Sequence, residues 1–258
     1  MWEKGEQSMK TNRREVSPFF YPGDERGLLL IHGFTGSTAE MIPMGTFFHS
    51  KGMTVHGPLL AGHGTTPEEM AKTGWKDWWQ SAVHGYERLK EAGCERIYVG
   101  GLSMGGLLAL RLAREKKVQG AISMAAPIRF RDRTAHFAFF IHHFIPYVGR
   151  GPQKAPHIEE VIVPYEKMPV KSVAELKRLM QDVRRGLPEI RTPVLIVQGK
   201  RDETIFPTDA KIIYETIGSQ QKEIHYYDNS SHILVLDHDR EKIFQDVYEF
   251  IQKLEGME

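Results

Sequence analysis

Short apolar runs alternate along this chain with longer segments in which apolar residues recur every three or four positions. The short runs contain few polar breaks, which is typical of strands buried on both faces and therefore of a parallel sheet. Runs of this kind predict strands at residues 27–31, 54–60, 96–100, 120–124, 193–199 and 223–228.

The longer segments have the period of amphipathic helices. In the segment 75–92, Trp78, Ala82 and Leu89 fall on one face, and in the segment 239–254 Asp239 occupies the position of an N-cap. A further helix is predicted over 208–217. Because strands and helices alternate, we expect an α/β fold: a doubly wound, mostly parallel sheet flanked by helices, with its site at the carboxyl ends of the strands.

One region interrupts this alternation. Between residues 128 and 188 no run is typical of a strand, and the segment is aromatic, basic and interrupted by prolines. Its clearest helix covers 171–186. We interpret 128–188 as a small cap inserted above the sheet of a single domain, 1–258, and 1–14 as a flexible N-terminal extension.

Composition narrows the class of protein. A chain of 258 residues with 41% hydrophobic residues suits one α/β domain with a large core. Acidic and basic residues are mixed, with a net charge of +1, so no nucleic-acid partner is indicated. The most apolar window, 136–148, is too short to span a bilayer, so no stable membrane insertion is expected.

Cysteine usage and the first residues bear on the compartment. Cys94 is the only cysteine, which rules out an internal disulfide and fits a reducing environment. Residues 1–14 are polar and lack the apolar region of a secretory signal. These observations favour a cytoplasmic protein.

The candidate chemistry begins at residues 101–105, which read Gly-Leu-Ser-Met-Gly. They lie between the predicted strand 96–100 and a helix-like apolar run, the setting of a nucleophile elbow. In that turn the glycines let strand and helix approach, and Ser103 is exposed beside a helix N-terminus. The alternative is a glycine-rich turn that only joins the two elements. A catalytic Ser103 requires a base, an acid and an oxyanion hole elsewhere in the chain.

Candidates for the base and the acid follow the last two predicted strands. His232 lies in the loop after 223–228, although a solvated loop histidine would look the same. Asp202 directly follows 193–199, with Glu203 as the neighbouring alternative. The order Ser103, Asp202, His232 is that of the α/β-hydrolases.

The oxyanion hole is expected after the first predicted strand. Glycines on both sides of Phe34 leave its backbone N–H free to turn toward the serine, and the N–H of Met104 would be the second donor. Nearby His32 and His63 are interpreted as structural residues that fix their loops.

Taken in order, these motifs resemble the small bacterial carboxylesterases and the bacterial monoacylglycerol lipases of the α/β-hydrolase superfamily. The resemblance covers roughly residues 17–254 and rests on five motifs: His32-Gly33-Phe34-Thr35-Gly36, Gly62-His63-Gly64, Gly101 to Gly106, the Asp202 turn and Ser231-His232. It implies ester hydrolysis without a cofactor and a small cap over an acyl pocket. No metal site is expected.

The function predicted from the sequence is that of a serine carboxylesterase acting on short to medium acyl chains through an acyl-enzyme. A small-molecule ester is the expected partner, and Phe137, Phe140 and Leu179 would provide an apolar underside of the cap for the acyl chain. Ordinary packing within the cap would explain the same residues. Because 130–162 matches neither group well, a monoacylglycerol lipase is the alternative. A thioesterase, amidase or serine peptidase with the same triad, and a non-catalytic binding protein on this fold, are further alternatives.

Overall fold

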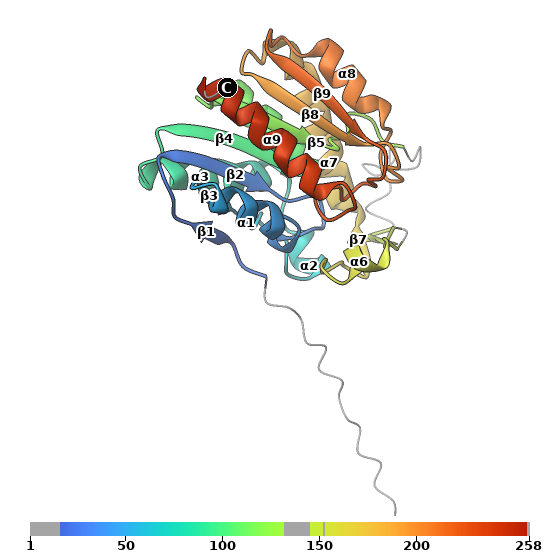
Figure 1. Ribbon diagram of the computed structural model, residues 1–258. Coiled ribbons are helices and arrows are strands. Elements are labelled where there is room, and N and C mark those ends of the chain that lie inside the picture. Colours follow the sequence, from blue (N-terminus) through green and yellow to red (C-terminus); the bar gives the residue numbers. More distant parts are fainter. Residues whose placement is uncertain (1–15, 132–144, 152, 257–258) are drawn as a thin grey trace, which may run out of the picture.

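A seven-stranded sheet runs through the protein (Figure 1), of which the computed structural model describes residues 16–131, 145–151 and 153–256. The strands lie in the order β1 (Phe19–Tyr21), β3 (Thr54–Gly57), β2 (Arg26–Ile31), β4 (Arg96–Leu102), β5 (Gly120–Met124), β8 (Val194–Gly199) and β9 (Lys222–Tyr227). Neighbouring strands are parallel except for β1, which pairs antiparallel with β3. The predicted doubly wound α/β sheet is therefore confirmed.

The edge strand β1 is absent from the sequence-based prediction. Its three residues are too few to show an alternating pattern. The ring of Phe19 packs against two glycines, because a Cβ atom at Gly45 or Gly57 would overlap it. The strand therefore depends on contacts with α1 (Ile42–Ser50) and β3 that the local sequence does not display.

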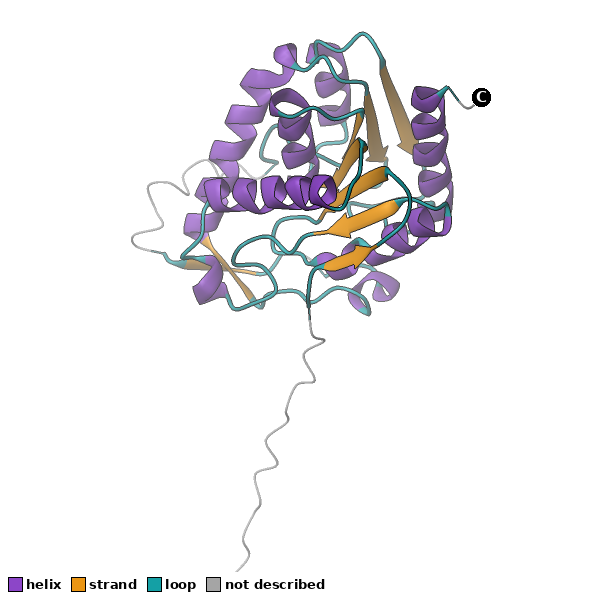
Figure 2. Ribbon diagram, turned by 90° about the vertical axis from the view of Figure 1, so that its left-hand side faces the viewer, coloured by secondary structure: helices purple, strands orange, loops and turns teal. Residues whose placement is uncertain are grey.

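Helices cover both faces of the sheet (Figure 2). On one face, α1 packs beside α9 (Arg240–Glu255), and both appear on the same side of the sheet in Figure 1. On the other face lie α3 (Trp75–Glu91), α4 (Met104–Glu115) and α8 (Thr208–Thr216), while α7 (Val170–Gly186) packs against α3 and α4. No helix in the described part of the chain is long and apolar enough to cross a membrane.

The two apolar faces of the sheet are visible within one strand. In β2, Leu28 and Leu30 contribute to the core beneath α1 and α9, whereas Leu29 and Ile31 contribute to the core beneath α3 and α4. All four side chains are fully buried. This is why the strand is a continuous apolar run rather than an alternating one.

The segment between β5 and β8 differs from the prediction in one respect. It contains a small antiparallel sheet of β6 (Tyr147–Gly149) and β7 (Lys167–Pro169), so the expectation of no strand over 128–188 is wrong. Each strand has three residues and ends in glycine or proline, which hides it from pattern analysis. The segment also contains α6 (Pro156–Glu159) and α7. The bounds of α7 agree within one residue with the helix predicted over 171–186.

The remaining elements are short. They are the helix α2 (Pro67–Met70), beside β7, and two 3-10 helices, Thr38–Glu40 and Leu187–Glu189. The predicted extension over 1–14 lies outside the described residues.

Candidate active site

Ser103 occupies a strained turn between β4 and α4. Its backbone angles are φ 55° and ψ −115°, in the left-handed half of the map that side chains disfavour. A Cβ atom at Gly101 would overlap the backbone of Gly105, and one at Gly105 would overlap the carbonyl oxygen of Ile31. The two glycines thus allow β4, α4 and β2 to meet, as the nucleophile-elbow hypothesis requires.

A cavity of about 680 Å³ opens beside this turn. Ser103 and His232 both line it, and so does Phe34. The carboxyl ends of β2 and β4 and the loop after β9 therefore bring the three sequence-predicted residues to one site.

Asp202 binds the imidazole of His232. The His232 Nδ1–H group donates to Oδ2 of Asp202 over 2.8 Å. The other carboxylate oxygen accepts from the backbone N–H groups of Thr204 and Ile205, both at 2.9 Å. This arrangement leaves His232 Nε2 free to accept a proton.

The charge state of Asp202 follows from these contacts. Burial opposes its ionisation, but the charge of His232, the hydrogen bond to His232 and two backbone N–H groups outweigh burial, so the pKa of Asp202 lies below its ordinary value. Asp202 is ionised at neutral pH and can stabilise an imidazolium at His232.

Glu203, the alternative acid, does not contact the imidazole. Its Oε2 accepts from the backbone N–H of His232 over 3.3 Å, and its other oxygen pairs with Lys154. The geometry therefore favours Asp202 as the partner of the ring, and Glu203 holds the backbone of the same residue.

Two further carboxylates hold the loop that carries His232. Asp239 Oδ2 accepts from the N–H of Asn229 and the hydroxyl of Ser230, both at 2.9 Å. Asp237 Oδ2 accepts from the N–H of Ser231 over 2.7 Å. Asp239 occupies the predicted N-cap position of α9, but its side chain makes no cap hydrogen bond, because it binds the loop instead.

The expected oxyanion donors flank the serine. A Cβ atom at Gly33 would lie 3.5 Å from Ser103 Cβ, so the loop that carries Phe34 lies against the turn. Met104 begins α4, and its N–H consequently has no acceptor within the helix. The loop that carries Phe34 and the first turn of α4 therefore both adjoin Ser103, as an oxyanion hole built from these two residues requires.

His32 and His63 pack behind this loop. His32 is fully buried; its Nε2 accepts from the N–H of Leu60 over 3.1 Å, and its Nδ1–H donates to the carbonyl of Gly33 over 2.9 Å. Burial and the neighbouring His63 lower the pKa of His32 to about 3, and burial lowers the pKa of His63 to about 4. Both rings are neutral near pH 7 and connect the two loops, a structural role.

Glu40 is a site residue that the sequence analysis missed. Its side chain lines the cavity, although the residue is only 4% exposed. Its Oε2 accepts from the N–H of Gly33 over 3.3 Å, and a Cβ atom at Gly36 would overlap its carboxyl group. Burial raises the pKa of Glu40 to about 7. In the sequence it is one acid in a polar turn, and only the fold shows that the turn is buried.

We expect the substitution Glu40→Gln to change how stability depends on pH. The unfolded chain loses the Glu40 proton near pH 4.5 and the folded protein near pH 7, so the wild type loses stability between these values. This difference between the two pKa values corresponds to about 3 kcal/mol of folding free energy. Glutamine does not titrate, so the variant does not lose that stability. The difference between the free energies of unfolding of the variant and of wild type should therefore be about 3 kcal/mol more in favour of the variant at pH 8 than at pH 4.

Denaturant unfolding at pH values from 4 to 8 measures this difference. Glu91→Gln, at an exposed position at the end of α3, is the matched control. Because exposed ion pairs contribute little, it should change the free energy of unfolding by less than about 1 kcal/mol. A Glu40→Gln curve parallel to that of wild type would contradict the expectation.

Of the three residues predicted to line the acyl pocket, only Leu179 lies within the described residues. Leu179 is fully buried in the core and is not among the residues that line the cavity. On the same helix, Val173 and Leu176 line it instead, because Leu179 lies on the part of the apolar face that packs against the body of the protein. Phe137 and Phe140 lie outside the described residues.

The fold and the site together define an α/β-hydrolase: a serine in a strained strand-to-helix turn and a His–Asp pair at the carboxyl edge of a parallel sheet. The family model described as serine aminopeptidase, S33, matches residues 24–239, and the chain belongs to this family. The predicted membership of the α/β-hydrolase superfamily is thus confirmed.

Individual proteins resemble the chain over nearly its whole length. The carboxylesterase of Bacillus subtilis (strain 168) is 35% identical over 241 residues, 92% of this chain and 97% of that protein. The thermostable monoacylglycerol lipase of Bacillus sp. (strain H-257) is 36% identical over 244 residues, 93% and 96% of the two chains. A solved structure from work on the metagenome-derived lipolytic enzymes LipS and LipT has a TM-score of 0.87 at 32% identity, covering 93% and 98% of the chains.

Proposed function

We propose that this chain is a serine carboxylesterase that hydrolyses carboxylic esters of short to medium acyl chains through an acyl-enzyme intermediate. The observation that carries the proposal is the His232–Asp202 pair, whose imidazole lines the same cavity as the strained Ser103. The similarity to a carboxylesterase and to lipolytic enzymes supports the class of carboxylic ester hydrolase.

In the proposed reaction Ser103 Oγ attacks the ester carbonyl carbon while His232 Nε2 takes the hydroxyl proton. The N–H groups of Phe34 and Met104 bind the oxyanion that forms. Asp202 stabilises the imidazolium. His232 then protonates the departing alcohol, and a water that it activates releases the acid and restores Ser103.

The cavity walls support an acyl site under a cap. We propose that residues 128–188 form this cap, since they supply much of the lining. The apolar part of that lining includes Phe130, Val148, Ile162, Val163, Met168, Val170, Val173 and Leu176. An apolar wall above the serine suits an acyl chain, because burying hydrocarbon there removes it from water.

Monoacylglycerol hydrolysis is the second candidate, favoured by the 36% identity to a monoacylglycerol lipase. This reaction would use the same three side chains and differ only in the alcohol that is released.

The single cysteine bears on the compartment. Cys94 is buried and forms no disulfide, which supports a location in the cytoplasm.

A matched substrate series tests the proposal. Simple esters of increasing acyl length and monoacylglycerols with the same acyl chains are compared by kcat/KM, alongside a thioester and an amide. We expect the highest value for a simple ester of short to medium chain. A monoacylglycerol preferred at equal acyl length would assign the second candidate, and faster amide or thioester cleavage would refute both.

A further inference from the structure

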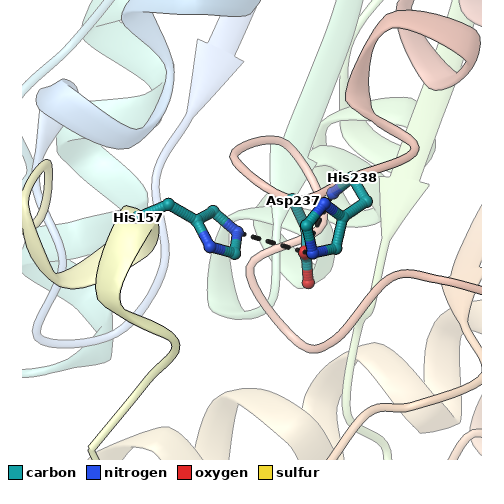
Figure 3. Close-up of side chains that lie close together, drawn as sticks. All are labelled: His157, Asp237 and His238. Atoms are coloured by element: carbon teal, nitrogen blue, oxygen red, sulfur yellow. Dashed lines mark hydrogen bonds and ion pairs between the residues drawn. The ribbon is translucent and has the colours of Figure 1, made fainter.

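Three side chains with metal-binding groups meet outside the proposed catalytic set (Figure 3). His157 lies in α6, and Asp237 and His238 lie just before α9. One potential ligand atom from each side chain lies within 4.8 Å of the other two. In the described ranges, this is the one group of three or more His, Cys, Asp or Glu residues gathered so closely.

The distances suit a shared ion. His157 Nε2 lies 3.2 Å and His238 Nε2 lies 3.8 Å from Oδ1 of Asp237. Ligand atoms about 2.1 Å from a tetrahedral zinc ion are about 3.4 Å apart. The His157 distance is close to that spacing and the His238 distance is slightly longer. In Figure 3 the His157 imidazole points toward the carboxylate.

The carboxylate is already oriented by the protein. Its second oxygen, Oδ2, accepts from the N–H of Ser231 over 2.7 Å and from the Ser231 hydroxyl over 2.5 Å. The other oxygen, Oδ1, accepts from the backbone N–H of His238 over 2.9 Å and faces both imidazoles, so supporting hydrogen bonds fix the orientation of the carboxylate.

Two imidazole nitrogens and one carboxylate oxygen select the kind of ion. Imidazole suits zinc, copper, nickel and cobalt, whereas calcium and magnesium prefer oxygen ligands. The His157 and His238 side chains are 40% and 68% exposed, so an ion can enter from solvent and keep a water in the fourth position.

We propose that His157, Asp237 and His238 form a binding site for one divalent transition-metal ion of the zinc type. The ion would join α6, in the segment whose residues line the cavity, to the loop that carries His232. Because these ligands, which are far apart in sequence, converge only in the folded chain, a bound ion should stabilise the folded protein.

Zinc titration of untagged, chelator-treated protein tests the site by calorimetry. We expect wild type to bind zinc, and His157→Ala and His238→Ala each to weaken the affinity at least about tenfold, since each removes one of three ligands. His84→Ala, an exposed position on α3, is the matched control and should keep the wild-type affinity. No saturable binding by wild type, or equal binding by His157→Ala, would overturn the proposal.

Thermal unfolding provides a second measurement. Zinc should raise the Tm of wild type and of His84→Ala by the same amount and raise the Tm of the other two variants less, and magnesium should raise none. Cooperative unfolding of each variant without metal shows that the substitution preserves the fold. A zinc-induced rise as large as that of wild type in both His157→Ala and His238→Ala would contradict the assignment. Neither measurement uses a substrate, so the result is independent of the proposed ester hydrolysis.

Discussion

Ser103→Ala should lower kcat for ester hydrolysis by about 10⁶, and His232→Ala should do the same. The first removes the proposed nucleophile, and the second removes the base without which a serine hydroxyl is a poor nucleophile. Because the two act as a unit, the double variant should be no slower than either single one. Turnover of one simple ester, measured for wild type and all three variants, provides the comparison.

Mass spectrometry after organophosphate treatment locates the nucleophile independently. Wild type should gain one adduct, on Ser103, and Ser103→Ala should gain none. Ser50→Ala, at an exposed position at the end of α1, should react like wild type. An adduct on another residue of the folded protein, or near-wild-type turnover by His232→Ala, would show that the roles are misassigned.

Asp202→Asn should lower kcat by about 10⁴. The new amide can donate a hydrogen bond to His232 Nδ1, so the imidazole would carry its own proton on Nε2. Nε2 could then no longer accept the hydroxyl proton of Ser103. The negative charge that stabilises the imidazolium is also lost. Steady-state kinetics on the same ester measure the effect, and circular dichroism checks that the variant is folded.

Glu203→Gln is the matched control for this substitution. Its amide oxygen can still accept from the backbone N–H of His232, and only the ion pair with Lys154 is lost. Because that pair is partly exposed, kcat should change by no more than a few-fold. If Glu203→Gln were the more damaging of the two, their roles would be exchanged.

Much of the sheet could be predicted because its strands are continuous apolar runs. The boundaries of β5 agree with the prediction, and those of β2, β4, β8 and β9 agree within two residues. The strands β1, β6 and β7 could not be predicted, since three residues carry no usable period and their partners lie far away in sequence.

The candidate site shows the same division. Ser103, Asp202 and His232 could be proposed because each follows a strand, and parallel strands end at one edge. Glu40 could not, because burial of a charged residue depends on which loops close over it. Leu179 shows a further limit: helical periodicity identifies an apolar face, but not which part of that face borders a cavity.

The left-handed backbone at residue 103 has a consequence for how this protein can change. Glycine would adopt φ 55° without strain, whereas a side chain there costs about 1–3 kcal/mol. Selection for folding stability alone would therefore drive the serine out of this position. Under the proposed function, the chemistry of the hydroxyl is what offsets this cost to stability.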